Sequence, residues 1–185
     1  MNNQANNYFN RISNAFSSVA EVQISQSLSL LKNALDTDAT IYLIGNGGSA
    51  ATASHFAADI SKTLNNKGRF GKAVSLCDNS SVVTAISNDF NFDQVFERQL
   101  SILANPGDVL VSISASGNSA NLVRAINYAN QHKIETLSMS GFTGGELAKI
   151  SKVSLHVSTI DGDYGVAEDC HSILCHFLSE QLRQE

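Results

Sequence analysis

The sequence has few cysteines and no long apolar run, and both absences exclude classes of protein. Its three cysteines are an odd number without a CxxC pair, so neither a disulfide framework nor a thiolate zinc site is expected. No stretch approaches the roughly 20 apolar residues that a membrane-spanning helix needs. The first residues also lack the basic start and apolar middle of a signal peptide. We therefore expect a cytoplasmic protein without a membrane partner.

Basic residues are scarce as well. The chain has 12 Lys and Arg against 17 Asp and Glu, a formal net charge of −5, and no cluster of Lys and Arg. Proteins that bind nucleic acid usually carry a basic stripe, so no nucleic-acid partner is expected. An anionic ligand would have to be held by local groups instead.

Length and composition predict one folded domain. A chain of 185 residues can form one domain with a substantial core, but not two ordinary domains. Its 43% hydrophobic and 16% charged residues fall in the globular range. We therefore interpret residues 1–185 as a single domain, with a helical segment at 1–36 and an α/β core at 37–185.

Hydrophobic periodicity predicts the fold class. Apolar residues recur three and four positions apart from Phe9 to Val19 and again from Ile24 to Leu35, which marks one helical face or two in succession. We predict a long amphipathic N-terminal helix, which could cap a sheet or, as we prefer, contact another subunit. Five short β-rich runs separated by helical stretches follow: 41–44, 73–77, 109–113, 135–139 and 153–157. A last helix is expected from about Tyr164 to Leu182. Continuous apolar strands that alternate with helices predict a three-layer, doubly wound α/β fold with a parallel sheet.

A glycine-rich turn follows the first predicted strand and leads into a helix. Its residues are Gly45-Asn46-Gly47-Gly48-Ser49. Glycines let a ligand approach the backbone, and the N–H groups and positive dipole end of a helix start suit a phosphate or a sugar hydroxyl. The turn also fits a dinucleotide-binding fingerprint, but Asp59 comes too early and Asp78 too late for the acidic residue of that motif. A plain glycine turn is the third alternative.

A second loop of similar character follows the third predicted strand. Its residues are Ser114-Ala115-Ser116-Gly117-Asn118-Ser119, and a helix is expected to begin near Ala120. One serine would be enough for an N-cap. Three hydroxyls with exposed N–H groups around a helix start form a neutral nest for a phosphate dianion, which needs no lysine. We predict that the two loops converge on one phosphoryl group.

Histidines and carboxylates occur at helical spacing after the first loop and in the last helix. His55 and Asp59 are four residues apart and therefore share one helix face. Glu168 and His176 are separated by about two turns, and the drift of roughly 80° still lets both point into one cleft. His171 could be functional or structural. These side chains are candidates for acid–base chemistry and for metal binding.

Taken together, these motifs resemble the sugar isomerase (SIS) domain family. The patterns GNGGSA-x-x-x-x-HFA and S-x-SGNS, with a late helix that carries spaced histidines, extend over most of the chain. The likeness is greatest to the branch that converts sedoheptulose 7-phosphate to D-glycero-D-manno-heptose 7-phosphate, through His55-Phe56-Ala57, Ser87-Asn88-Asp89-Phe90, 114–119 and His171/His176. The resemblance implies a flavodoxin-like sheet, a homotetramer with sites between subunits, and an aldose–ketose isomerase that supplies cell-surface heptose.

The resemblance also implies roles for individual residues. Asp59 and His176 match the catalytic pair, because isomerisation needs a base for the proton beside the carbonyl and an acid for the oxygen. The expected substrate-binding residues are Asn46, Gly47, Gly48, Ser49, Thr84, Asn88, Asp89, Ser114, Ala115, Ser116, Ser119 and Glu168. The expected ligands of one zinc ion per subunit are His55, Asp59, Glu168 and His176, a donor set that zinc accepts.

Four positions depart from the family's pattern. Asp59 replaces a longer glutamate, and Glu168 stands where glutamine is usual. Val166 replaces a common arginine, and Ala115 replaces a threonine, so one phosphate hydroxyl is missing. The changes at 59 and 168 could compensate each other, giving a firmer metal site or a different heptose-like substrate, or they could abolish catalysis. The alternative function is therefore a non-catalytic SIS protein that senses a sugar phosphate or binds a partner.

Overall fold

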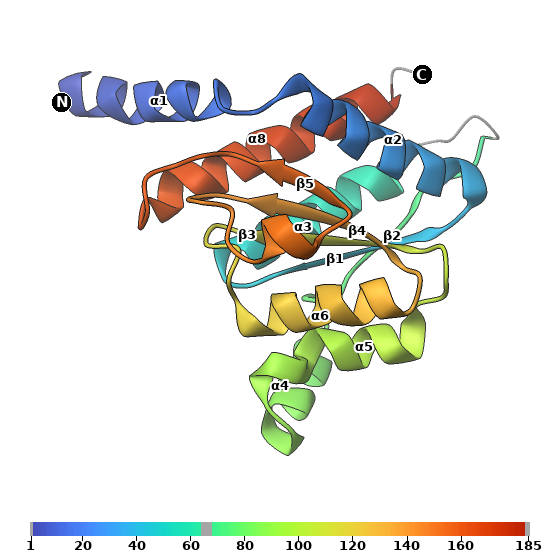
Figure 1. Ribbon diagram of the computed structural model, residues 1–185. Helices are drawn as coiled ribbons and strands as arrows, with labels where there is room; N and C mark the ends of the chain where they lie inside the picture. Colours follow the sequence, from blue (N-terminus) through green and yellow to red (C-terminus); the bar gives the residue numbers. More distant parts are fainter. Residues whose placement is uncertain (1, 64–67, 184–185) are drawn as a thin grey trace.

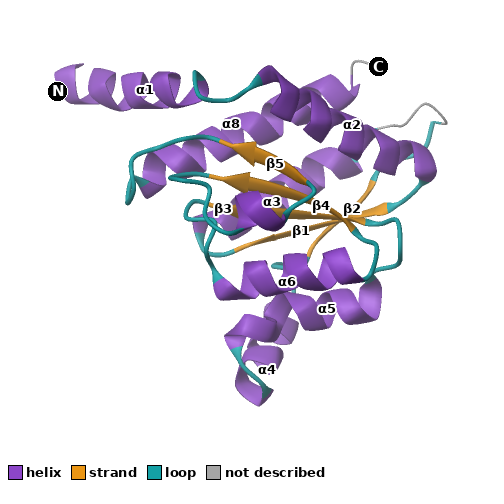
Figure 2. Cartoon of the chain, viewed as in Figure 1, coloured by secondary structure: helices purple, strands orange, loops and turns teal. Residues whose placement is uncertain are grey.

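Five parallel strands form the centre of the computed structural model, which describes residues 2–63 and 68–183 (Figures 1 and 2). Their order in the sheet is β2-β1-β3-β4-β5. The strands are β1 (Thr40–Gly45), β2 (Lys72–Ser75), β3 (Val109–Ser114), β4 (Glu135–Ser140) and β5 (Val153–His156). The helices are α1 (Asn2–Phe16), α2 (Glu21–Thr37), α3 (Gly48–Ser61), α4 (Ser80–Asp89), the 3-10 turn η1 (Phe92–Gln94), α5 (Val95–Leu103), α6 (Ala120–Gln131), α7 (Leu147–Ile150) and α8 (Tyr164–Arg183).

Helices cover both faces of the sheet, which confirms the predicted doubly wound α/β fold. Ile41 and Leu43 of β1 point to the core beneath α2, α3 and α8, whereas Tyr42 and Ile44 point to the core beneath α5 and α6. Successive side chains of a strand face opposite sides, so a strand covered on both faces must be apolar throughout. That requirement explains the continuous apolar runs in the sequence.

The predicted long N-terminal helix is two helices in the structure. The hydroxyls of Ser17 and Ser18 donate to the backbone oxygens of Asn14 and Ala15, each at 2.6 Å, and so satisfy acceptors at the end of α1. The chain then runs through extended backbone at Ala20 before α2 begins. The α2 helix packs on the sheet, whereas the first part of α1 extends away from it (Figure 1). None of the helices described is both long enough and apolar enough to span a bilayer.

The site-forming edge of the sheet lies at the carboxyl ends of β1 and β3. These strands are neighbours, and Gly45 at the end of β1 pairs with Ile113 near the end of β3. The chain leaves β1 for α3 on one face and leaves β3 for α6 on the other face. Ligands of open α/β sheets bind in the crevice at such a point, and both glycine- and serine-rich loops begin there.

Candidate functional site

The two predicted loops are joined by a reciprocal pair of hydrogen bonds. The Asn46 side-chain amide donates to Asn121 Oδ1 at 2.9 Å, and the Asn121 amide donates to Asn46 Oδ1 at the same distance. Asn121 belongs to the first turn of α6 and is buried. Two amide groups that satisfy each other fix the separation of the two helix starts. The starts of α3 and α6 are therefore held next to each other. Asn121 itself was not predicted, because an isolated asparagine within a helix carries no motif.

The serine loop after β3 is held by its own side chains. Gly117 N–H donates to Ser114 Oγ at 3.1 Å, and Asn118 N–H donates to Ser116 Oγ at 3.3 Å. Ser114 is buried, while Ser116 and Ser119 are half-buried at the start of α6. The serines thus shape the loop as well as lining it, and their hydroxyl protons can still be donated to an anion.

Ala115, a predicted substrate-binding residue of the second loop, has apolar surroundings. Its methyl group packs in a small buried apolar cluster with Phe142 and Ala167 of α8. Because an alanine has no hydroxyl, this position offers a ligand only its backbone. The side chain at this position packs against apolar neighbours, and the cluster contains no hydroxyl in place of the missing one.

Glu168 of α8 lies against the start of α3. A Cβ atom added to Gly48 would be 2.3 Å from Glu168 Oε2, so a side chain at position 48 would displace this carboxylate. A negative charge beside a helix N-terminus is stabilised by the helix dipole and by the N–H groups of the first turn. Glu168 therefore borders the first loop, as its predicted contact with substrate requires.

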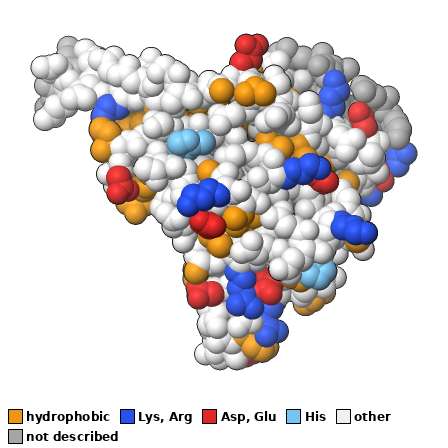
Figure 3. All heavy atoms as spheres, in the orientation of Figure 1, with side chains coloured by type: hydrophobic (Ala, Val, Ile, Leu, Met, Phe, Trp, Pro, Cys, Tyr) orange, Lys and Arg blue, Asp and Glu red, His pale blue; other side chains and the backbone are white. Residues whose placement is uncertain are grey.

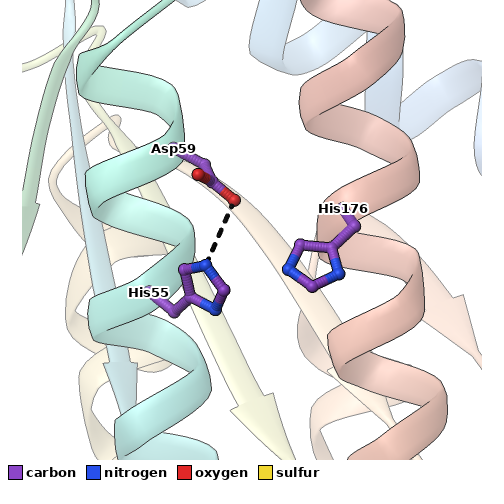
Figure 4. A group of neighbouring side chains, drawn as sticks. All are labelled: His55, Asp59 and His176. Carbon is purple, nitrogen blue, oxygen red and sulfur yellow. Dashed lines mark ion pairs between the residues drawn. The ribbon is translucent and has the colours of Figure 1, made fainter.

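A histidine and carboxylate cluster lies farther along the same two helices (Figure 4). His55 and Asp59 of α3 and His176 of α8 bring their ligand atoms within 4.8 Å of one another. His55 Nε2 is 3.6 Å from Asp59 Oδ2, and the two imidazole centroids are 4.9 Å apart. Asp59 is buried, whereas both histidines are exposed. Two histidines and one carboxylate with an exposed side are a donor set for a catalytic divalent metal.

This cluster contains three of the four predicted metal ligands. Within residues 2–63 and 68–183 it is the one group of His, Cys, Asp and Glu side chains close enough to hold an ion. Glu168 is not a member of the group, because it lies two turns earlier on α8 beside Gly48. The eight-residue spacing to His176 was compatible with one cleft but did not bring the two side chains to the same point.

The charge on Asp59 is set by its neighbours. Burial raises the pKa of this carboxyl, but the Lys62 ammonium 2.8 Å from Oδ1, together with His55 and His176, lowers the pKa below its ordinary value. Asp59 is therefore ionised at neutral pH and can accept a proton or bind a cation. Lys62 was missed in the sequence, although its i,i+3 spacing from Asp59 was a usable signal.

A pocket of about 490 Å³ opens beside the cluster and provides access to it. It is lined by His55, Asp59, His176, Glu180 and Arg183. Glu180 and Arg183 lie on the last turns of α8 and were not predicted as site residues. The cluster thus has an accessible side where a small polar ligand can reach the histidines.

The predicted substrate-binding residues of α4 lie away from the cluster within a single chain. Thr84, Asn88 and Asp89 are exposed, and α4 buries none of its side chains. Their side-chain hydrogen bonds stay within α4, such as Thr84 Oγ1 donating to the Ser80 oxygen at 2.7 Å. The α4 helix forms the narrow projection at the bottom of the molecule (Figures 1 and 3). Their predicted role requires a ligand or a second chain that reaches this projection.

His171 lies in the buried part of α8. It is fully buried, and neither ring nitrogen makes a hydrogen bond of ordinary geometry with the residues described. Burial lowers the pKa of His171 to about 4, against a weaker opposing effect of the Ser140 backbone. The ring is therefore neutral at pH 7, and it does not belong to the cluster of His55, Asp59 and His176.

Comparisons with known proteins point to one family. Residues 6–141 match the family model described as SIS domain. The chain is 36% identical over 163 residues to a phosphoheptose isomerase of Syntrophotalea carbinolica, covering 88% of this chain and 82% of that protein. A phosphoheptose isomerase of Helicobacter pylori is 35% identical over 87% of this chain and 83% of its own length. The structure of a phosphoheptose isomerase from Neisseria gonorrhoeae superposes with a TM-score of 0.87 at 30% identity, covering 98% of this chain and 96% of that one.

Proposed function

This chain belongs to the SIS domain family and is an isomerase of phosphosugars, and we propose that it converts sedoheptulose 7-phosphate to D-glycero-D-manno-heptose 7-phosphate. The observation that carries the proposal is the pairing of Asn46 with Asn121, which holds the first predicted phosphate loop next to the helix start that follows the second. Incubating the purified protein with sedoheptulose 7-phosphate and measuring the aldose product tests it. The absence of aldose would contradict it.

The spacing of the groups along α3 fits the length of an extended sugar phosphate. His55 is seven residues beyond Gly48, which corresponds to about 10 Å along a helix. This separation is close to the length of an extended heptulose from its phosphate to its carbonyl end. A substrate held by its phosphate at the loops would therefore bring its reacting carbons to Asp59 and His176.

The chemistry divides between the loops and the cluster. Backbone N–H groups at the starts of α3 and α6, with the hydroxyls of Ser49, Ser116 and Ser119, bind the phosphate dianion. The ionised Asp59 takes the proton from the carbon beside the carbonyl, and His176 exchanges a proton with the neighbouring oxygen. Returning the proton to the other carbon converts ketose to aldose. The assembled pair supports an enzyme over the non-catalytic alternative.

The fit of the cluster to a divalent ion supports a zinc cofactor, one per chain. His55, Asp59 and His176 would hold the ion, and Glu168 stays a predicted ligand that borders the substrate at the start of α3. Bound zinc would polarise the substrate's carbonyl and hydroxyl oxygens. One oxygen of Asp59 is engaged by Lys62, so the ammonium competes with the ion for this carboxylate.

Replacing Lys62 with methionine should therefore tighten zinc binding about tenfold, because unit charges about 4 Å apart near a protein surface repel by roughly 1–4 kcal/mol. The substitution frees Asp59 Oδ1 and removes a positive charge that repels a dication. The measurement is a competition titration with a chromophoric chelator. Lys149→Met, which removes a surface lysine paired with Glu146, is the matched control and should leave the affinity unchanged. Unchanged or weaker zinc binding in Lys62→Met would contradict the competition, and zinc retained in His55→Ala would contradict the site.

A homotetramer is our proposal for the assembly. The cluster lies on an outward face beside the exposed side chains of Ile173 and Phe177, and a second chain would cover this apolar surface. Such a chain could also bring Thr84, Asn88 and Asp89 of its α4 to the site. Light scattering should give the mass of four chains for the unmodified protein and a smaller mass for Phe177→Glu. Ile102→Glu on α5, at a position 80% exposed, is the control. A monomeric unmodified protein would contradict the proposal.

The cytoplasmic location stays a prediction.

A further inference from the structure

The helices α3 and α8 run in the same direction, and polar groups of the two helices face each other along their seam. Three levels are defined by contacts between side chains or, at Gly48, by the space that a Cβ would fill. From the phosphate loop to the cluster, the levels are Gly48 with Glu168, Thr52 with Ser172, and His55 with His176. The first level borders the phosphate site and the third contains the reacting groups, so the second lies between them.

The middle level consists of the Thr52 and Ser172 hydroxyls, which make long hydrogen bonds. Thr52 Oγ1 is 3.3 Å from Ser172 Oγ and 3.3 Å from the backbone oxygen of Gly48. Ordinary O–H···O hydrogen bonds are about 2.5–3.0 Å long, so both contacts are long ones. Both side chains are half-buried. Each hydroxyl can donate one proton and accept through its oxygen, and the pair therefore has capacity for a ligand.

The position of this pair matches the middle of a bound heptulose. Thr52 is four residues beyond Gly48 and three residues before His55, which correspond to about 6 Å and about 4.5 Å along the helix. A sugar that extends from the loops to the cluster passes this level with its C4 and C5 hydroxyls. The phosphate and the reacting carbons are recognised elsewhere, and the Thr52 and Ser172 hydroxyls are the groups of α3 and α8 that lie at the level of the central hydroxyls.

We propose that the Thr52 and Ser172 hydroxyls bind one hydroxyl group at C4 or C5 of the substrate and thereby contribute to the choice of sugar. The inference rests on the proposed function, because it requires a phosphosugar that spans the seam. A hydrogen-bonded hydroxyl far from the reacting carbons contributes equally to the bound substrate and to the transition state. Its removal should therefore change KM and leave kcat nearly the same.

The test compares kcat and KM for sedoheptulose 7-phosphate in Thr52→Val, Ser172→Ala and the double variant. Valine has the shape of threonine without the hydroxyl, which limits any effect on folding. Each single variant should raise KM about fivefold, and kcat should stay within about twofold, as expected for the loss of one neutral hydrogen bond. The double variant should raise KM by less than the product of the two single effects, because both hydroxyls bind the same group.

Two further variants separate recognition from packing. Thr52→Ser keeps the hydroxyl and should keep the KM of the unmodified protein. Ser54→Ala removes another α3 hydroxyl, one that is bonded to Ser75 on the β2 side, and should also leave KM unchanged. If the unmodified protein is active and both Thr52→Val and Ser172→Ala keep its KM, this inference is overturned while the proposed function stands. A loss of kcat at constant KM would overturn it too, whereas an unmodified protein that forms no aldose would remove the proposed function and this inference with it.

Discussion

Replacing Asp59 with asparagine should lower kcat for sedoheptulose 7-phosphate by about 10³-fold, within the range that a positioned acid or base contributes. Asparagine keeps the size of the side chain and can still accept a hydrogen bond from Lys62. It cannot take the proton from the carbon beside the carbonyl, however. The measurement is the rate of aldose formation at saturating substrate, and KM should change far less than kcat.

Two variants complete this experiment. His176→Ala should cause a loss of similar size, because it removes the partner that serves the oxygen. Asp161→Asn changes an exposed carboxylate in the loop before α8 and should retain the activity of the unmodified protein. Full activity in Asp59→Asn or in His176→Ala would refute the assignment of this pair as acid and base.

Gly117→Ala should disrupt the serine loop and with it the binding of phosphate. Gly117 has a φ of +67°, which L residues adopt at a cost, and a Cβ atom there would lie 2.0 Å from the backbone oxygen of Gly144. Backbone strain and the displaced neighbouring loop together should cost about 3 kcal/mol of unfolding free energy. For a chain of this size that cost corresponds to a fall in Tm of roughly 6–12 °C. The KM for the sugar phosphate should rise more than tenfold, since the loop would no longer hold its N–H groups in place.

Gly107→Ala is the matched control for the backbone effect. Gly107 also has a positive φ, +94°, but open space surrounds the position of its Cβ. This variant should lose only about 1 kcal/mol from backbone strain and keep the KM of the unmodified protein. A Gly117→Ala variant with the same Tm and KM as the Gly107→Ala variant would show that the contact with Gly144 has no role in the site.

The helices α1 and α2 show where pattern alone reaches its limit. Their apolar residues are spaced by three and four up to Val19 and again from Ile24, and the five-residue step between these two is compatible with one helix or with two in succession. The interruption depends on where the two segments pack. The α2 helix covers the sheet, while the buried Ala15 near the end of α1 belongs to the core with α8. One straight helix could not make both contacts.

The candidate site was likewise predictable only in part from the sequence, because the rest depends on how helices pack. His55 and Asp59 could be paired from the sequence, because four residues on one helix fix their separation. The distance from this pair to His176 depends on how α3 packs against α8, more than a hundred residues later. The same packing placed Glu168 beside Gly48 and outside the cluster. Neither result can be read from spacing within a single helix.

The amino-acid sequence by itself determined the parallel α/β fold, the two loops at helix starts and the candidate acid–histidine groups. All of these follow from local rules, namely the period of a strand or a helix and the residues that a turn or a helix start requires. Tertiary structure alone decided the break between α1 and α2, the pairing of Asn46 with Asn121 and the seam between α3 and α8. These features depend on the directions of side chains and on how segments that are distant in the chain pack together. Neither can be read directly from the order of residues.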